Sequence, residues 1–187
     1  VRSAAFRGFN NQDKGLFIST RFGNVSQLHL VKSAGAARNQ ITYFQEPIGS
    51  VTMHPTKSSI AFTMDKGGTE NAQIYLLNPE SSSTQMLTDG TSRNGGPLWS
   101  NAGNHIAFQS TKRNGSSNDV WMMPIDNPQK SELILESPDG TWWGAVDWSE
   151  DDSKVLIQNY ISIAKSKAYI VDLTTKEKSL ILGEKDS

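Results

Sequence analysis

The sequence predicts an all-β fold made of four copies of one four-stranded unit. Short apolar segments rich in β-branched and aromatic residues alternate with clusters of Gly, Asn, Asp, Ser and Pro, which is the pattern of antiparallel hairpins. No convincing stretch of helical periodicity occurs among the 187 residues. The same sequence elements also recur at a nearly constant interval, which indicates a repeated architecture.

The repeat is clearest around the second strand of each unit. An apolar triplet stands at three positions, separated by 46 and 49 residues: Ile60-Ala61-Phe62, Ile106-Ala107-Phe108 and Val155-Leu156-Ile157. A residue pair precedes each triplet, with the first copy matched more loosely: Met53-His54, Trp99-Ser100 and Trp148-Ser149. Because both elements shift together, the motif is part of the architecture and not a single site.

An earlier copy completes the set of four. Its first strand is expected at residues 5–9, and Phe17-Ile18-Ser19-Thr20-Arg21 parallels Phe108-Gln109-Ser110-Thr111-Lys112. The expected third strands alternate apolar with larger polar or aromatic residues: Gln27–Leu30, Gln73–Leu76, Asp119–Met122 and Lys167–Ile170. Each copy is expected to close with a short apolar strand: Gln40–Phe44, Gln85–Thr88, Glu132–Leu135 and Ser179–Leu182.

Four antiparallel strands in a repeat of roughly 45 residues are typical of a β-propeller blade. We therefore expect one partial propeller segment of about four blades: residues 1–45, 46–92, 93–139 and 140–187. Blades bury their faces against neighbours, so the two terminal faces would stay open. The chain is then expected to be half of a longer polypeptide, a four-blade unit that pairs with a second copy, or a small ring closed on itself.

Composition excludes several classes of function. The 18 basic and 19 acidic residues give a net charge of −1, so neither nucleic acid nor an anionic membrane is an expected partner. The absence of cysteine excludes disulfides, zinc–thiolate sites and thiol nucleophiles. No apolar run is long enough to span a membrane, and the N-terminus has no export signal pattern. Since Val1 begins inside a strand-like pattern, we expect a fragment or a processed product.

The three histidines are expected to be structural. In the aligned repeats, His29 takes the position of Tyr75 and Trp121, and His54 takes that of Trp99 and Trp148. Both positions therefore accept residue types other than histidine. The third histidine is His105, and no two of the three have metal-ligand spacing. We therefore expect no metal site and no cofactor.

Two further segments are interpreted as loops. The acidic run Glu150-Asp151-Asp152 occupies the turn between a first and a second strand, where a solvated turn is favoured over a paired-carboxylate or calcium site. Ser137–Gly140 has the composition of a blade turn but lies in the connection between blades, out of register with the other copies. No G-x-S-x-G motif occurs, and no residue is predicted to be catalytic.

The segment Thr141–Trp148 is the densest aromatic cluster. First strands of a propeller border its central channel, so exposed aromatic rings there could stack on a peptide or a sugar. The alternative is that Trp148 repeats the core residue Trp99, while Trp142 or Trp143 packs between blades. Three basic residues recur after second strands and are expected either to contact carboxylates across blades or to lie in solvent: Arg21, Lys112 and Arg113.

These blade motifs resemble those of TolB-like and prolyl-oligopeptidase-type propellers. The resemblance rests on Trp-Ser before a turn, on Ile-Ala-Phe, on Ser-Thr followed by a basic residue, and on third strands such as "DVWMM" and "QIYLL". It covers nearly the whole chain. The segments "GLFISTRFGNVSQLHLV" and "PLWSNAGNHIAFQSTKRNG" look most like the N-terminal propeller of secreted or envelope serine peptidases of the prolyl oligopeptidase family.

The resemblance implies a non-catalytic role. The propeller of that family covers a C-terminal α/β-hydrolase domain and admits oligopeptides to its active site, and no part of that domain is found in this sequence. A peptide substrate or a protein partner and a periplasmic or secreted location are implied in the same way. The dipeptidyl-peptidase branch holds the substrate amino terminus with a glutamate pair, but this sequence has no Glu-Glu. A TolB-like protein-binding scaffold without enzymatic activity is the alternative function.

Overall fold

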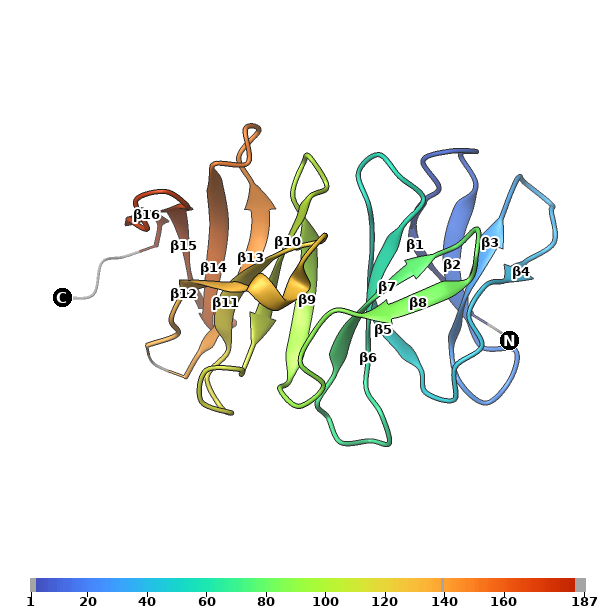
Figure 1. Cartoon of the computed structure of the whole chain (residues 1–187), viewed down its shortest axis with the longest axis horizontal. Coiled ribbons are helices and arrows are strands. Elements are labelled where there is room, and N and C mark those ends of the chain that lie inside the picture. The colour runs from blue at the N-terminus through green and yellow to red at the C-terminus, as the bar shows by residue number, and fades with distance from the viewer. Residues whose placement is uncertain (1–2, 139, 184–187) are drawn as a thin grey trace. The chain divides into compact units, whose positions relative to one another are not determined.

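The structure is a computed structural model that describes residues 3–138 and 140–183 (Figure 1). The chain divides into two compact units, Val1–Gly90 and Thr91–Ser187, and each is described by itself. Each unit contains two four-stranded antiparallel sheets whose strands are ordered as in the chain. These four sheets confirm the predicted all-β fold, a partial propeller of four blades.

The first unit holds blades 1 and 2. Blade 1 consists of β1 (Ala4–Phe9), β2 (Leu16–Thr20), β3 (Gln27–Val31) and β4 (Asn39–Gln40). Blade 2 consists of β5 (Ile48–Met53), β6 (Ile60–Met64), β7 (Gln73–Asn78) and β8 (Ser83–Met86). The buried core of this unit draws on both blades: Phe17, Leu28, Ile48, Ile60, Phe62 and Leu77. Neighbouring blades therefore bury each other's apolar faces, as the repeat predicts.

The second unit holds blades 3 and 4. Blade 3 consists of β9 (Asn94–Trp99), β10 (His105–Ser110), β11 (Asp119–Pro124) and β12 (Glu132–Leu135), with the short 3₁₀ turn η1 (Pro128–Lys130) before β12. Blade 4 consists of β13 (Trp142–Trp148), β14 (Lys154–Ser162), β15 (Lys165–Asp172) and β16 (Lys178–Leu182). Its core also spans two blades: Ala107, Val120, Ile134, Leu135, Trp143, Trp148, Val155, Ile157 and Val171. Within residues 3–138 and 140–183, no helix is long and apolar enough to cross a membrane.

The apolar triplets form the second strand of their blades. Ile60, Ala61 and Phe62 are at most 1% exposed, and the matching residues of β10 are at most 2% exposed. A strand that is covered on both faces has no solvent side, so its sequence is a continuous apolar run. This explains why the triplet is the most regular signal of the repeat.

An asparagine in each unit joins the first turns of its two blades. In blade 1, Asn11 donates its side-chain amide to the carbonyl oxygen of His54 at 2.7 Å. In blade 3, Asn101 makes the same contact with the carbonyl oxygen of Ser149 at 2.8 Å. Both acceptors begin the turn between first and second strands of the next blade. The repeated asparagine therefore holds neighbouring blades together at this end.

A buried polar residue at a matching position of the third strand holds the connection to the next blade. In three blades a backbone N–H of that connection donates to this side chain: Phe44 to Gln27 at 3.0 Å, Gly90 to Gln73 at 2.9 Å and Ser137 to Asp119 at 2.9 Å. In blade 4 the position is occupied by Lys167, which is also buried. Ser137 thus has the same role as Phe44 and Gly90, although it lies one residue further along the chain from its third-strand partner than they do.

Two of the closing strands end earlier than expected. The sequence predicts strands over Gln40–Phe44 and Gln85–Thr88, but β4 ends at Gln40 and β8 at Met86. Beyond these points side chains replace the strand ladder: the hydroxyl of Thr42 accepts from the Leu28 N–H at 2.8 Å, and that of Thr88 accepts from the Ile74 N–H at 3.1 Å. The predicted strand Glu132–Leu135 is confirmed, and Ser179–Leu182 begins one residue earlier, at Lys178.

Candidate functional site

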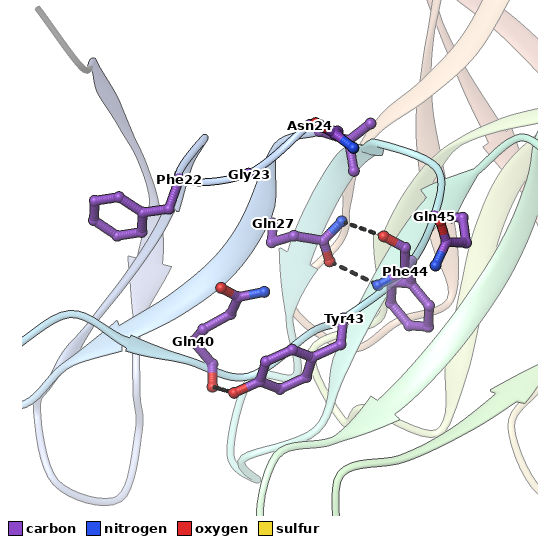
Figure 2. Close-up of a pocket in the computed structure, with 9 residues that line it drawn as sticks. Phe22, Gly23, Asn24, Gln27, Gln40, Tyr43, Phe44 and Gln45 are labelled. Atoms are coloured by element: carbon purple, nitrogen blue, oxygen red, sulfur yellow. Dashed lines mark hydrogen bonds between the residues drawn. The ribbon is translucent and has the colours of Figure 1, made fainter.

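Each unit has a pocket at the end of the blades where two kinds of connection meet. These are the loop between the second and third strands and the connection from the fourth strand to the next blade. In the first unit the pocket encloses about 240 Å³ in blade 1 (Figure 2). Nine residues line it: Phe22, Gly23, Asn24, Val25, Gln27, Gln40, Tyr43, Phe44 and Gln45. None of them carries a formal charge.

Gln27 fixes the inner wall of the blade 1 pocket. Its carboxamide donates to the carbonyl oxygens of Phe44 at 3.1 Å and Glu46 at 3.3 Å, and it accepts from the Phe44 N–H at 3.0 Å. Figure 2 shows the two bonds to Phe44, which resemble a short piece of β-ladder. Gln27 is 5% exposed, so this residue holds the pocket in shape and presents little surface to a ligand.

Aromatic rings form the exposed rim. Tyr43 is 74% exposed, and its hydroxyl donates to the carbonyl oxygen of Gln40 at 2.9 Å, which fixes the ring across the opening (Figure 2). Phe22 is 42% exposed and meets the ring of His29 edge-on, with centroids 5.1 Å apart. The Phe44 ring stacks on the buried Phe62. Aromatic faces beside carboxamide groups suit an uncharged segment that offers apolar surface and amide groups, such as a peptide.

The second unit has a pocket of about 290 Å³ at the same ends of its strands. Its lining comes from both blades: Arg93, Asn94, Gly95, Gln109, Asn118 and Trp142. This pocket differs from that of blade 1 because it holds a cation, Arg93, opposite an indole that is 40% exposed. The two pockets therefore suit ligand groups of different charge.

The structure gives His29 a structural role. It is 1% exposed, and its Nδ1 lies 3.1 Å from the carbonyl oxygen of Gln27, while its Nε2 is buried and has no hydrogen-bond partner in the described part of the chain. Burial lowers the pKa of this imidazole, and the positive charge of Arg38 acts in the same direction. The strand register pairs His29 with Ile18 as it pairs Tyr75 with Phe62 and Trp121 with Phe108, which confirms that His29 matches Tyr75 and Trp121. The same register makes Ile18 the counterpart of Phe108, so the alignment of Phe17–Arg21 with Phe108–Lys112 was wrong by one residue.

The other two histidines have local partners in the framework: His54 directly follows β5, and His105 begins β10. The Nδ1 atom of His54 accepts from the backbone N–H groups of Thr56 and Lys57 at 3.1 and 3.0 Å, so it carries no proton. The alignment of His54 with the two tryptophans was wrong by one residue, because it is Met53 that pairs with Ile60 in the register of those tryptophans. Nδ1 of His105 lies 2.9 Å from Oδ1 of Asn104.

The acidic run forms a turn, and two of its members have separate partners. Asp151 accepts from the Ser149 and Ser153 hydroxyls at 2.7 and 2.8 Å, and these bonds lower its pKa to about 2. Asp152, with a φ of 57°, accepts from the backbone N–H groups of Asn101 and Ala102 in blade 3, both at 2.8 Å. In the described part of the chain, no three His, Asp or Glu side chains gather as metal ligands would.

The tryptophans divide into core and rim. Trp148 and Trp99 are both 7% exposed and hold the same register position, which confirms that Trp148 repeats Trp99. Trp143 is 2% exposed, lies in the core of the two blades and stacks on Tyr169 with centroids 5.2 Å apart. Trp142 is 40% exposed and lines the pocket that also holds Arg93.

The three basic residues lie at exposed positions, as one of the two expectations states, and two of them also have partners within their own blade. Arg113 binds two carboxylates of its own blade: Asp119, with Nε–Oδ2 at 2.7 Å, and Glu136 at 3.7 Å. Lys112 lies over the ring of Trp121, 4.9 Å from its centroid, also within the blade. Exposed Arg21 donates to the carbonyl oxygen of Gly23 at 3.3 Å. Of the segment Ser137–Gly140, Asp139 lies outside the described residues, and the remainder forms the expected connection between blades.

The analysis of the sequence missed both pockets. Tyr43 was assigned to a strand, and Arg93 and Asn118 carried no recognisable motif. Their signal is positional: Asn118 directly precedes the buried Asp119, and Tyr43 and Arg93 lie in connections between a fourth strand and the next blade. The blade alignment could have placed these connections at one end of their strands, but it could not show which side chains face a cavity.

Solved structures that superpose on this chain include three kinds of protein. A prolyl endopeptidase, studied for the role of inter-domain dynamics in catalysis and specificity, superposes with a TM-score of 0.76 at 11% identity, over 98% of this chain and 30% of that one. The putative TolB of Agrobacterium tumefaciens gives 0.69 at 20% identity, over 89% of this chain and 60% of that one. An oligogalacturonate lyase in complex with manganese gives 0.60 at 8% identity, over 96% of this chain and 66% of that one.

These likenesses establish the fold, and the chain spans less than a third of the length of the prolyl endopeptidase. No curated protein sequence matches the chain. A family model does match: that of the N-terminal β-propeller domain of prolyl oligopeptidase, over residues 44–186, which is more than half of the sequence. The chain therefore belongs to the family of prolyl oligopeptidase N-terminal β-propeller domains.

Proposed function

We propose that this chain is the non-catalytic propeller segment of a prolyl oligopeptidase family serine peptidase. In this role it docks peptide substrates and controls their access to an α/β-hydrolase domain that is not found in this sequence. The family match over residues 44–186 is the observation that carries the proposal. The two pockets support it, because they present exposed aromatic rings and carboxamides at the strand ends where a peptide would dock.

The proposed docking surface lies at what we call the connection ends of the blades. This end carries the loops between second and third strands and the connections from each fourth strand to the next blade. Tyr43 and Phe22 offer apolar faces, and Gln40, Gln45 and Asn24 contribute carboxamides beside them. An extended peptide needs both, because its side chains are partly apolar and each of its amide groups seeks a hydrogen bond. The walls are fixed by buried polar residues, so the surface is formed before the peptide arrives.

A TolB-like scaffold without enzymatic activity is the second candidate. The observation in its favour is the superposition on the putative TolB of Agrobacterium tumefaciens, which has a higher sequence identity than the prolyl endopeptidase. In that function the same connection ends would bind a protein partner.

One experiment separates the two functions. An antibody raised against the 187-residue chain captures the native polypeptide that carries it, and a fluorophosphonate probe then labels any active serine hydrolase. The peptidase proposal predicts a labelled band larger than the chain itself, with no label on the isolated chain. A captured band that stays unlabelled, next to a labelled control peptidase, would support the scaffold.

We further propose that two copies of the isolated chain associate through apolar side chains of the terminal blade. Ile163, Ile181 and Leu182 are 98%, 53% and 67% exposed. Solvent-exposed apolar side chains on an open blade favour association. Light scattering over a range of concentrations should give a dimer mass. A monomer at the highest concentration would contradict this proposal and leave the peptidase proposal unaffected.

A further inference from the structure

The pocket of the second unit contains an arginine that has no carboxylate partner among the described residues. The guanidinium of Arg93 donates to Oδ1 of Asn118 at 3.2 Å, and no described carboxylate lies within ion-pair distance of it. Its backbone is fixed on both sides by Thr111, which accepts from the Arg93 N–H through its hydroxyl and donates its own N–H to the Arg93 carbonyl oxygen, both at 3.0 Å. The cation is therefore held at the pocket while most of its donors stay available.

The neighbouring groups complete a polar lining. Oδ1 of Asn118 receives the bond from Arg93, so its amide N–H₂ is left to donate toward a ligand. Gln109 donates its amide to the carbonyl oxygen of Trp143, which leaves its side-chain oxygen as an acceptor. Asn118 and Gln109 are both half-buried. The pocket thus offers one cation, one neutral donor and one neutral acceptor.

An indole forms the apolar wall of this pocket. Trp142 lies against the backbone of Gly144, where an added Cβ would stand 2.5 Å from the ring. Gln109 contacts the same glycine, since that Cβ would stand 2.8 Å from its Nε2. Because Gly144 has no side chain, the Trp142 ring and the Gln109 carboxamide can both pack against its backbone. Gly95 lines the pocket without a side chain, which leaves room for a ligand to approach the backbone.

We infer that this pocket binds the carboxylate of a peptide, with Arg93 and Asn118 on the carboxylate, Trp142 against the apolar part of the same residue and the Gln109 oxygen on a peptide N–H. Arginine is suited to this task because its planar donors match the two oxygens of a carboxylate. The inference deepens the proposed peptide docking and rests on it. A carboxylate of this kind comes either from a peptide C-terminus or from an Asp or Glu side chain.

The test follows the indole N–H resonance of Trp142 in the 187-residue chain, assigned with Trp142→Phe. Three peptides that share one apolar sequence are titrated: a blocked peptide with a free C-terminal carboxylate, its C-terminal amide, and an amide in which one residue is glutamate. We expect the free acid to shift the Trp142 resonance and to bind about tenfold or more tightly than the plain amide. Added salt should weaken the binding of the acid and not that of the amide.

Two variants make the test specific. Arg93→Gln keeps the backbone bonds to Thr111, so the fold should persist, and it should weaken the acid about tenfold while leaving the amide unchanged. The matched control is Arg38→Gln, which makes the same charge change at an exposed position of the first unit and should alter nothing. If the glutamate peptide matches the free acid, a side chain is an adequate source of the carboxylate; if it matches the plain amide, the C-terminus is required.

The outcomes distinguish this inference from the proposed docking. Equal binding of acid and amide, or an Arg93→Gln variant that binds the acid as well as the parent chain, overturns the carboxylate site while peptide docking stands. A Trp142 resonance that none of the three peptides shifts overturns it as well. The labelling experiment on the native polypeptide is independent of both results, since it reports only whether a serine hydrolase is attached.

Discussion

Arg113 and Asp119 form a two-point ion pair inside blade 3, with Nε–Oδ2 at 2.7 Å and Nη2–Oδ1 at 3.0 Å. The Asp119 side chain is fully buried, and its Oδ1 also accepts from the Ser137 N–H, which belongs to the connection to blade 4. The pair therefore links a loop, a strand and a connection. In blades 1 and 2 the residue at this position is a neutral glutamine, which binds the connection to the next blade.

The ion pair predicts a large effect of Arg113→Ala. The substitution leaves the buried Asp119 carboxylate without its cation, so it should lower the free energy of unfolding clearly more than the control below. Denaturant unfolding measures it. Arg21→Ala is the matched control, since Arg21 is exposed, and it should change stability by less than about 0.5 kcal/mol. Equal effects of the two substitutions would show that Asp119 does not depend on Arg113.

The asparagines between blades predict a smaller and repeated effect. Asn101→Ala removes hydrogen bonds to Ser149 and Asp152 of blade 4, and Asn11→Ala removes those to His54 and Pro55 of blade 2. Each should cost about 1 kcal/mol in the free energy of unfolding. Asn39→Ala, at an exposed position of β4, serves as the control. If all three variants were equally stable, these contacts would not hold the blades together.

Burial of His29 predicts a pH dependence of stability. Its pKa is lowered in the folded state, so between that value and about 6.5 the unfolded chain binds more protons than the folded one. The contribution is fully present above pH 6.5 and is lost as pH falls through this window. His29→Phe should flatten the dependence of unfolding free energy on pH there, while Tyr75→Phe at the same repeat position should leave it as it is. If the slope of unfolding free energy against pH stayed the same in His29→Phe, a group other than His29 would cause it.

The turn at Asp151 predicts an unusually acidic carboxyl. Hydrogen bonds from Ser149 and Ser153 hold its pKa at about 2, below the ordinary 3.8. Its contribution to stability is therefore present above pH 3.8 and lost as pH falls toward 2. Carbon-13 NMR of the side-chain carboxyl should show a midpoint near 2, and Ser149→Ala should move it upward. A midpoint at 3.8 in the parent chain would mean that the serine hydroxyls do not bind the carboxylate in solution.

The sequence predicted the parts of the fold that depend on apolar pattern. Ile60-Ala61-Phe62 and its two copies were assigned correctly because strands buried on both faces tolerate few residue types. The end of β4 was missed because the side chains of Thr42 and Gln27 take the place of backbone hydrogen-bond partners beyond it. An apolar pattern does not indicate such a replacement. Likewise Gln27 and Asp119 share one role with unlike side chains, so a comparison of residue types does not reveal it.

The pockets were beyond the reach of the sequence for a related reason. Arg93, Asn118 and Trp142 come from three separate segments, and their meeting depends on the length of two connections and on the space that Gly144 leaves for the indole. The aromatic cluster drew attention to Trp142 but equally to Trp143, which is buried. Only the three-dimensional packing separates a ring that forms the core from one that faces a cavity.

The central claim is that this chain docks peptides without cleaving them. The most direct test titrates the isolated 187-residue chain with a blocked oligopeptide, follows backbone resonances by NMR and then examines the peptide by mass spectrometry. We expect saturable shifts confined to the connection ends, around Tyr43 and Trp142, and an intact peptide after prolonged incubation. Cleavage of the peptide by the pure chain, or the absence of any saturable shift at those two residues, would contradict the claim.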